Sequence, residues 1–224
     1  MTAALDTAVT YDTEASAGTA RERSGLYGFL AEVFRAEPSR DLLRRIKDER
    51  FAAVLEAAGA HLREELTHQP EDALLEALAV EYTRLFLGPG RHVRPYAATY
   101  LGGPGASLCG QATIWARNFM EAAGFALTPE RWDLPDHVSV ELEFMARMAA
   151  READALDAGD VAAASQSRRV QKEFLETHLG RWLPQFCGHA AGHAELSFYR
   201  ELARLAGHFL DSELASFTQA EVPA

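Results

Sequence analysis

Apolar residues recur at helical spacing along almost the whole chain. Leu26, Phe29, Leu30, Val33 and Phe34 occupy positions i, i+3, i+4, i+7 and i+8, which share one face of a helix. The same spacing returns in later segments, among them residues 75–86, 106–124, 138–149, 161–179 and 197–217. No segment alternates apolar and polar residues over a length that would predict a strand. The sequence therefore predicts an all-α fold.

Glycine and proline residues interrupt this helical pattern in two long loops. Residues 88–105 contain eight such helix breakers and predict a long loop, and residues 125–136 predict a second one, which we interpret as a hinge. Residues 1–20 lack Lys, Arg and any continuous apolar run, so we expect a disordered tail and neither a signal peptide nor a membrane anchor. Residues 21–220 should then form a single-domain bundle of about eight to ten helices, given an average helix of about 11 to 12 residues.

The charge balance narrows the possible partners. The chain carries 22 basic and 33 acidic side chains, a formal net charge of -11, which opposes binding to nucleic acid and favours cationic partners. No apolar run reaches the roughly 18 residues that a membrane span requires, so we expect no stable membrane insertion. Cys109 and Cys187 are the only cysteines and belong to no Cys-x-x-Cys pair, which fits a reducing cytoplasm.

Two clusters of potential metal ligands do not amount to a metal site. Glu65 and His68 have the Glu-x-x-His spacing of di-iron bundles, but a second copy of the motif is missing. Cys187, His189 and His193 lie close in sequence, yet two glycines interrupt them and no fourth ligand follows. No nucleophile with a supporting base is evident. We therefore predict no catalytic residue, no metal and no cofactor.

An aromatic-rich helix end suggests an apolar groove. Tyr82, Leu85 and Phe86 close the helix before Gly88, and the loop that follows contributes Pro95, Tyr96 and Tyr100. Large apolar side chains beside a loop stiffened by glycine and proline can build the wall of a groove. Burial of the same side chains in the core is the alternative explanation.

Asp136 and His137 precede the helical segment that begins near Val138 and allow two interpretations. In the first, Asp136 caps that helix by accepting backbone hydrogen bonds, and His137 is a partly exposed residue of the first turn. In the second, the carboxylate and the imidazole lie at the mouth of a groove, where they could hold an arginine guanidinium. Spacing alone leaves both interpretations open.

Several fragments of the chain together resemble the TorD/DmsD family of redox-enzyme maturation chaperones. The resemblance is carried by Leu26-Tyr27-Gly28-Phe29-Leu30, by residues 81–86 with Gly88-Pro89, by Pro95-Tyr96 with Tyr100, by Pro135-Asp136-His137 through Met145, by residues 174–179 with Trp182 and Pro184, and by residues 198–203. Each fragment is short, but their order and spacing along most of the chain are specific. The resemblance implies an all-helical fold with a hinge before Pro135.

The resemblance also implies a function. Members of this family are not enzymes; they bind the twin-arginine signal peptide, and often the body, of a molybdopterin-dependent oxidoreductase of the dimethyl-sulfoxide-reductase type, and delay its Tat export until the cofactor is inserted. The expected partners are therefore this signal peptide and the apo-molybdoenzyme, bound by a cytoplasmic monomer or domain-swapped dimer. Carried over by position, the signal-peptide-binding residues are Tyr27, Tyr82, Leu85, Phe86, Pro95, Tyr96, Tyr100, Asp136, His137 and Glu141.

One departure from the family pattern concerns charge. Arg91 and Arg94 lie in the loop before Pro95, where relatives commonly have two prolines and often tryptophan. Two cations there would repel the arginines of a client. The other functions that the sequence leaves open are a helical carboxylate-bridged metalloenzyme and an all-α adaptor for an unrelated peptide.

Overall fold

The computed structural model describes residues 13–62, 66, 69–88, 93–103, 108–127 and 134–219. Its elements are α1 (Thr13–Arg35), α2 (Arg40–Lys47), α3 (Glu49–Ala57), α5 (Glu71–Tyr82), π-helical η1 (Thr83–Leu87), α6 (Ala97–Leu101), α7 (Gln111–Ala122), α8 (Val138–Asp157), α9 (Val161–Phe174), π-helical η2 (Leu175–Leu179), α10 (Gly180–His193) and α11 (Ser197–Gln219). Because η1 extends α5 and η2 joins α9 to α10, these residues form nine continuous helices. The predicted all-α fold is confirmed.

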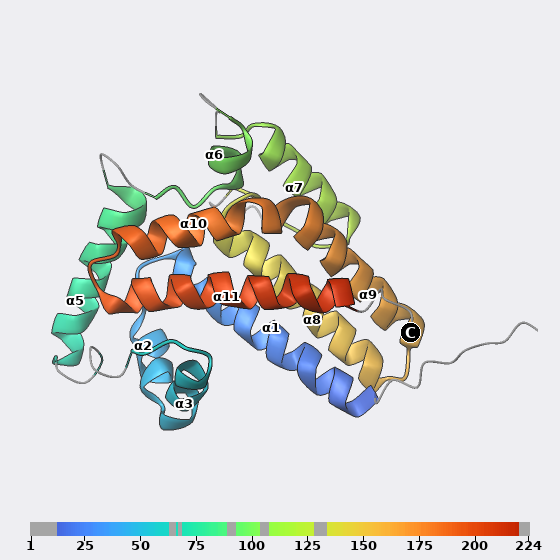
Figure 1. Cartoon of the computed structure of the whole chain (residues 1–224), viewed down its shortest axis with the longest axis horizontal. Coiled ribbons are helices and arrows are strands. Elements are labelled where there is room, and N and C mark those ends of the chain that lie inside the picture. Colours follow the sequence, from blue (N-terminus) through green and yellow to red (C-terminus); the bar gives the residue numbers. More distant parts are fainter. Residues whose placement is uncertain are drawn as a thin grey trace, which may run out of the picture.

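Four long helices form the centre of the molecule, namely α1, α8, the continuous helix α9–η2–α10, and α11. α1 packs along α8, α8 also contacts α9, and α11 packs on α10 and touches α1 (Figure 1). The short α6 lies against α10 and α7, while α2 and α3 pack on each other at the end of the molecule that also holds α5. Each central helix therefore has neighbours on more than one side, as its apolar residues require.

The core is continuous through these helices. Leu30 and Phe34 of α1, Phe144 of α8, Phe186 of α10 and Tyr199 of α11 are almost completely buried. Burial of each such side chain contributes roughly 1.5 to 3 kcal/mol before the cost of chain entropy. The apolar face predicted for residues 26–34 is thus the face of α1 that packs into the core.

The predicted tail and loops differ in part from the structure. The prediction of one long loop over residues 88–105 is wrong, because Ala97–Leu101, which contain neither glycine nor proline, form the short helix α6. α1 begins at Thr13, eight residues before the expected start at Arg21, so residues 13–20 belong to this helix and not to the tail. The division into a tail and a helical domain otherwise stays a prediction, as residues 1–12 lie outside the described ranges. Residues 128–133 of the predicted hinge and Pro89, Gly90, Arg91 and His92 of the first loop also lie outside them. None of the helices that the structure describes combines the length and the apolar character that a bilayer crossing requires.

The π-helical segment η2 fixes the orientation of α10 relative to α9. A π segment inserts one extra residue into the hydrogen-bond ladder and rotates the side chains that follow it. At its end, a Cβ on Gly180 would lie only 2.7 Å from the carbonyl oxygen of Leu175, so glycine is the one residue that fits without a shift. The rotation places His178 and Trp182 toward α8, where both contact Glu141.

Candidate functional site

Two adjacent residues before α8 cap two different helices. The carbonyl oxygen of Asp136 accepts a hydrogen bond from the backbone N–H of Ala97 and its Oδ2 atom accepts one from Ala98, both at 2.9 Å, so Asp136 caps α6. His137 caps α8 instead, because its Nδ1 atom accepts from the backbone N–H of Ser139 at 3.2 Å. The interpretation that Asp136 caps the helix after it, with His137 partly exposed, is therefore wrong: His137 is buried and holds that position.

Asp136 retains one carboxylate oxygen without a partner. The side chain is fully buried, and within the described residues its Oδ1 atom has no hydrogen-bond partner. A buried polar atom is usually paired, since leaving it unpaired costs about 1 to 3 kcal/mol. The unpartnered oxygen is a place where a donor from outside the chain would be stabilised.

A second buried carboxylate, Glu141, lies one helical turn further along α8. Its Oε1 atom lies 2.7 Å from Nε2 of His178, and its Oε2 atom accepts a hydrogen bond from the Trp182 indole at 2.9 Å. Burial raises the pKa of Glu141, the contacts with His178 and Trp182 oppose that rise, and the nearby Asp136 carboxylate adds to it. We call Asp136, His137, Glu141, His178 and Trp182 the acidic cluster.

Aromatic rings cover the acidic cluster on its outer side. The Tyr96 ring lies 5.0 Å from the His137 ring, and the Tyr100 ring lies 5.5 Å from that of Trp182. The indole of Trp115 on α7 stacks on His178 with the ring centroids 4.6 Å apart, and Trp115 is 36% exposed. Tyr96 and Tyr100 are half-buried. Three partly exposed aromatic rings thus pack against His137, Trp182 and His178, the residues of the acidic cluster that adjoin or contact the two buried carboxylates.

The structure separates the predicted site residues into three groups. The first group lies in or beside the acidic cluster and consists of Pro95, Tyr96, Tyr100, Asp136, His137 and Glu141. Tyr82, Leu85 and Phe86 are at most 4% exposed and pack in the core, where Phe86 lies against the rings of Phe34, Phe186 and Tyr199. In this conformation they form no exposed groove wall.

Tyr27 belongs to neither of these places. Its hydroxyl donates to Glu213 at 3.0 Å, within a buried network that joins α1, α8, α9 and α11. Conversely, His178, Trp182 and Trp115 belong to the cluster or its cover but were not among the predicted site residues. Trp182 and the segment containing His178 did contribute to the family resemblance, and this resemblance was the sequence signal from which they could have been predicted as site residues.

The charged pair of the Glu81–Phe86 motif has a structural role. Arg84 donates to both carboxylate oxygens of Glu81, at 2.7 and 2.8 Å, and to the carbonyl oxygen of His193 at 2.8 Å. Glu81 in turn accepts from the backbone N–H groups of Glu195 and Leu196. The pair, which we call the Glu81–Arg84 clamp, holds the connection between α10 and α11.

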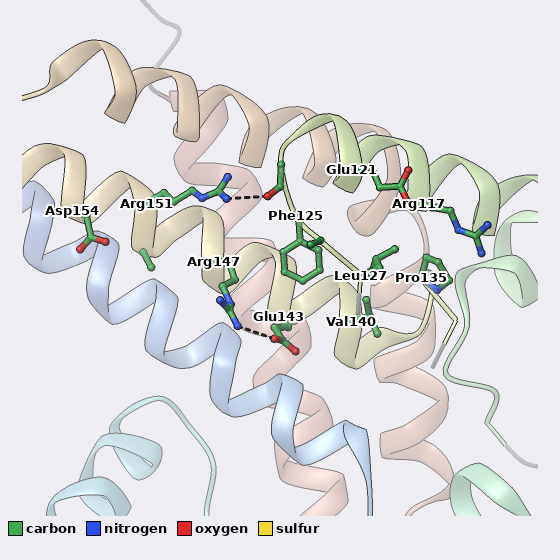
Figure 2. Close-up of a pocket in the computed structure, with 13 residues that line it drawn as sticks. Arg117, Glu121, Phe125, Leu127, Pro135, Val140, Glu143, Arg147, Arg151 and Asp154 are labelled. Carbon is green, nitrogen blue, oxygen red and sulfur yellow. Dashed lines mark hydrogen bonds and ion pairs between the residues drawn. The ribbon is translucent and has the colours of Figure 1, made fainter. Parts of the chain in front are cut away.

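A large cavity adjoins the start of α8. It has a volume of about 920 Å³ and lies between the end of α7 and α8 (Figure 2). Its floor is apolar and its rim is charged; the lining includes Phe125, Leu127, Pro135 and Val140 below and Arg117, Glu121, Glu143, Arg147, Arg151 and Asp154 around them. Pro135 and Val140 immediately precede Asp136 and Glu141, so the cavity and the acidic cluster share one stretch of backbone.

The candidate metal ligands are only partly described. Glu65 and His68 lie outside the described residues. Cys187 is buried whereas His189 and His193 are exposed, and in the part of the chain that the structure describes no three His, Cys, Asp or Glu side chains are placed to hold a metal ion. The expectation of no metal and no cofactor stays a prediction.

The fold and the acidic cluster define an all-α protein with buried charges under an aromatic cover, an arrangement typical of a helical binding protein. Residues 48–188, which are 141 of the 224, match the model of the nitrate reductase delta subunit family, so the chain belongs to this family, which includes the TorD chaperones. It is 26% identical to the chaperone protein TorD of Vibrio cholerae serotype O1 (strain M66-2) over 86% of this chain and 90% of that protein. Identity to TorD of Photobacterium profundum is 31% over 65% of each chain.

A solved structure supports the fold. The chain resembles the crystal structure of a protein from Archaeoglobus fulgidus described as a candidate redox enzyme maturation protein, with a TM-score of 0.52, 23% identity, and coverage of 84% of this chain and 93% of that one. The resemblance inferred from the sequence motifs is confirmed. The protein is a TorD-type redox-enzyme maturation chaperone and not a catalyst.

Proposed function

We propose that this protein is a cytoplasmic chaperone that binds the twin-arginine signal peptide and the apo form of a molybdopterin-dependent oxidoreductase of the dimethyl-sulfoxide-reductase type. It assists cofactor insertion and delays Tat export until the client has folded. One observation carries the proposal: in a member of this chaperone family, the unpartnered Oδ1 atom of Asp136 lies buried near Glu141 beneath an aromatic cover.

The acidic cluster has the chemistry that an arginine guanidinium needs. A guanidinium donates hydrogen bonds in a planar fork that matches carboxylate oxygens, and such charge-assisted bonds are about twice as strong as neutral ones. Access requires a shift of the half-buried Tyr96 or Tyr100, because Asp136 itself is fully buried. The net charge of -11 would draw a basic peptide toward the protein before the specific contacts form.

The cavity between α7 and α8 suits the apolar part of the same peptide. A signal peptide joins its arginines directly to an apolar run, and the floor of Phe125, Leu127, Pro135 and Val140 adjoins the acidic cluster. Burial of about 300 to 400 Å² of apolar peptide surface would contribute roughly 8 to 10 kcal/mol before association costs offset most of it. The binding is then reversible, as release of the client requires.

A peptide titration tests the proposal. We expect a synthetic twin-arginine signal peptide, taken from an oxidoreductase encoded beside this protein, to show saturable binding in isothermal titration calorimetry. Asp136→Ala should weaken binding by about tenfold or more, since one charge-assisted hydrogen bond is lost. Glu76→Ala is the matched control, because it removes an exposed carboxylate on α5 that does not line the cavity and should leave affinity nearly unchanged.

Two results would contradict the proposal. One is the absence of saturable binding. The other is undiminished binding by the Asp136→Ala/His137→Ala variant while circular dichroism shows unchanged helicity. A peptide with both arginines replaced by glutamine separates the charge from the apolar contribution, since only the first should disappear.

A further inference from the structure

A smaller cavity between α6 and α10 differs in the charge of its lining from the acidic molecule as a whole. It has a volume of about 280 Å³ and is lined by Val93, Arg94, Thr99, Tyr100, Gln185, His189 and His193. Three of these side chains are basic, three carry neutral hydrogen-bond donors and none is a carboxylate. Three larger cavities lined by described residues each have a glutamate on the wall, namely Glu143, Glu56 and Glu173.

The donors that line this cavity are available to a ligand. Arg94 is exposed, and no described residue forms an ion pair or hydrogen bond with its guanidinium. The Nδ1 atom of His193 donates to the carbonyl oxygen of His189 at 2.8 Å, so Nε2 is the ring atom that a ligand in the cavity would meet. Burial raises the pKa of Tyr100, so its phenol keeps its proton.

We propose that this cavity binds a tetrahedral oxyanion, such as the phosphate group of a small molecule. The cavity is lined by polar groups from three separate stretches of chain, namely a guanidinium, two imidazoles, a phenol, a hydroxyl and an amide. Groups of these kinds donate hydrogen bonds to phosphate oxygens. In a chain with an excess of acidic residues, a cavity without a carboxylate is an exception that favours an anion.

The position of α6 links this anion site to the acidic cluster. Thr99 and Tyr100 line the anion site, whereas the backbone N–H of the preceding Ala98 donates to Asp136. A ligand that displaced α6 at the anion site would also change the contact between Ala98 and Asp136, and a ligand at Asp136 would change the anion site. The two ligands would therefore alter each other's affinity by the same factor. This coupling rests on the proposed function, but the anion site itself does not.

Sulfate is the probe that tests the site, since it stays a dianion from pH 6 to 8. The titratable and charged groups around the two imidazoles are Arg94, Tyr100, Arg84 and Glu195. We expect the side-chain NMR signals of His189 and His193 to shift on titration with sulfate, and inorganic phosphate should compete for the same signals.

Matched variants decide the outcome. Arg94→Gln should weaken sulfate binding by about tenfold, because a charge-assisted contact is lost, and the His189→Gln/His193→Gln variant should weaken it as well. His208→Gln changes an exposed histidine on α11 that does not line the cavity and should behave like the unmodified protein. Equal sulfate affinity in Arg94→Gln and the unmodified protein, or unshifted His189 and His193 signals at saturating sulfate, would overturn the anion site. Neither result depends on the signal-peptide titration, so each proposal can fail alone.

Discussion

At the scale of single residues, burial gives the two cysteines different reactivity toward alkylating reagents. Cys187 lies inside α10, and burial raises the pKa of its thiol to about 12, with a smaller contribution from the Asp211 carboxylate; Cys109 is exposed. Because the thiolate is the reactive form, we expect iodoacetamide at pH 8 to alkylate Cys109 alone in the native protein and both cysteines in urea. Intact-mass spectrometry counts the adducts. The Cys109→Ser variant should show none while native, and rapid modification of Cys187 in that variant would contradict the expectation.

Single residues also show how far the sequence could predict the site. The sequence singles out Asp136 and His137 either as a helix cap or as the polar end of a groove, but which helix each caps depends on α6, which lies about forty positions earlier. Tyr82 and Phe86 were expected in a groove wall and are in the core. Helical spacing identifies an apolar face without identifying what covers it, so the core and a groove look alike in sequence.

At the scale of elements, the Glu81–Arg84 clamp ties the end of α5 to the connection between α10 and α11. Burial alone would raise the pKa of Glu81, but hydrogen bonds from Arg84 and from the backbone of Glu195 and Leu196 outweigh it, so the pKa is lowered. A lowered pKa means that the carboxylate stabilises the folded state above its unfolded pKa near 4.5, and that this contribution is lost as the pH falls through the folded value.

The Glu81→Gln variant tests the clamp. We expect it to lower the free energy of unfolding by about 1 to 2 kcal/mol at pH 7, because the charged hydrogen bonds are lost, and the difference from the unmodified protein should shrink below pH 4.5. Urea unfolding followed by circular dichroism at pH 7 and pH 4 measures both quantities. Glu201→Gln, which breaks the pair with exposed Arg204, is the control and should change stability by less than about 1 kcal/mol. A pH-independent difference for Glu81→Gln would contradict the ionic role.

Elements differ in how well the sequence reveals them. The long helices could be predicted because their apolar residues repeat at a constant interval, as those of α1 and α8 do. The π segments η1 and η2 could not, since one extra residue per segment leaves the local pattern nearly unchanged. Gly180 and Pro184 mark the η2 region in sequence, but only the short distance from Gly180 to the Leu175 carbonyl explains why a glycine stands there.

At the scale of the whole molecule, one buried arginine joins four helices. Arg23 of α1 forms hydrogen bonds with Glu213 of α11, Glu152 of α8 and Gln171 of α9. Burial opposes the charged form of Arg23, but its pKa is raised because the contacts with Glu213 and Glu152 outweigh that effect. Removing the cation would leave buried carboxylates without a counter-charge, which typically costs about 3 to 5 kcal/mol. The free energy of unfolding of the bundle therefore depends strongly on the side chain of Arg23.

The Arg23→Met variant tests this arrangement. We expect its free energy of unfolding in urea to fall by about 3 to 5 kcal/mol, while Arg23→Met/Glu213→Leu recovers part of the loss, because one of the unpaired carboxylates is gone. The exposed pair of Arg204 and Glu201 again provides the comparison, and Arg204→Met should have an effect below about 1 kcal/mol. A loss for Arg23→Met as small as that of Arg204→Met would show that the network contributes little.

The packing of α1 on α8 has a consequence for the order in which the protein acquires its structure during synthesis. The two helices are the most extensively packed pair in the molecule, yet 102 residues lie between Arg35 and Val138. At roughly 5 to 20 residues per second, the apolar face of α1 waits about 5 to 20 s for its partner to leave the ribosome. For that interval the nascent chaperone presents an uncovered hydrophobic helix, and so meets the same hazard of premature association from which a chaperone protects its client.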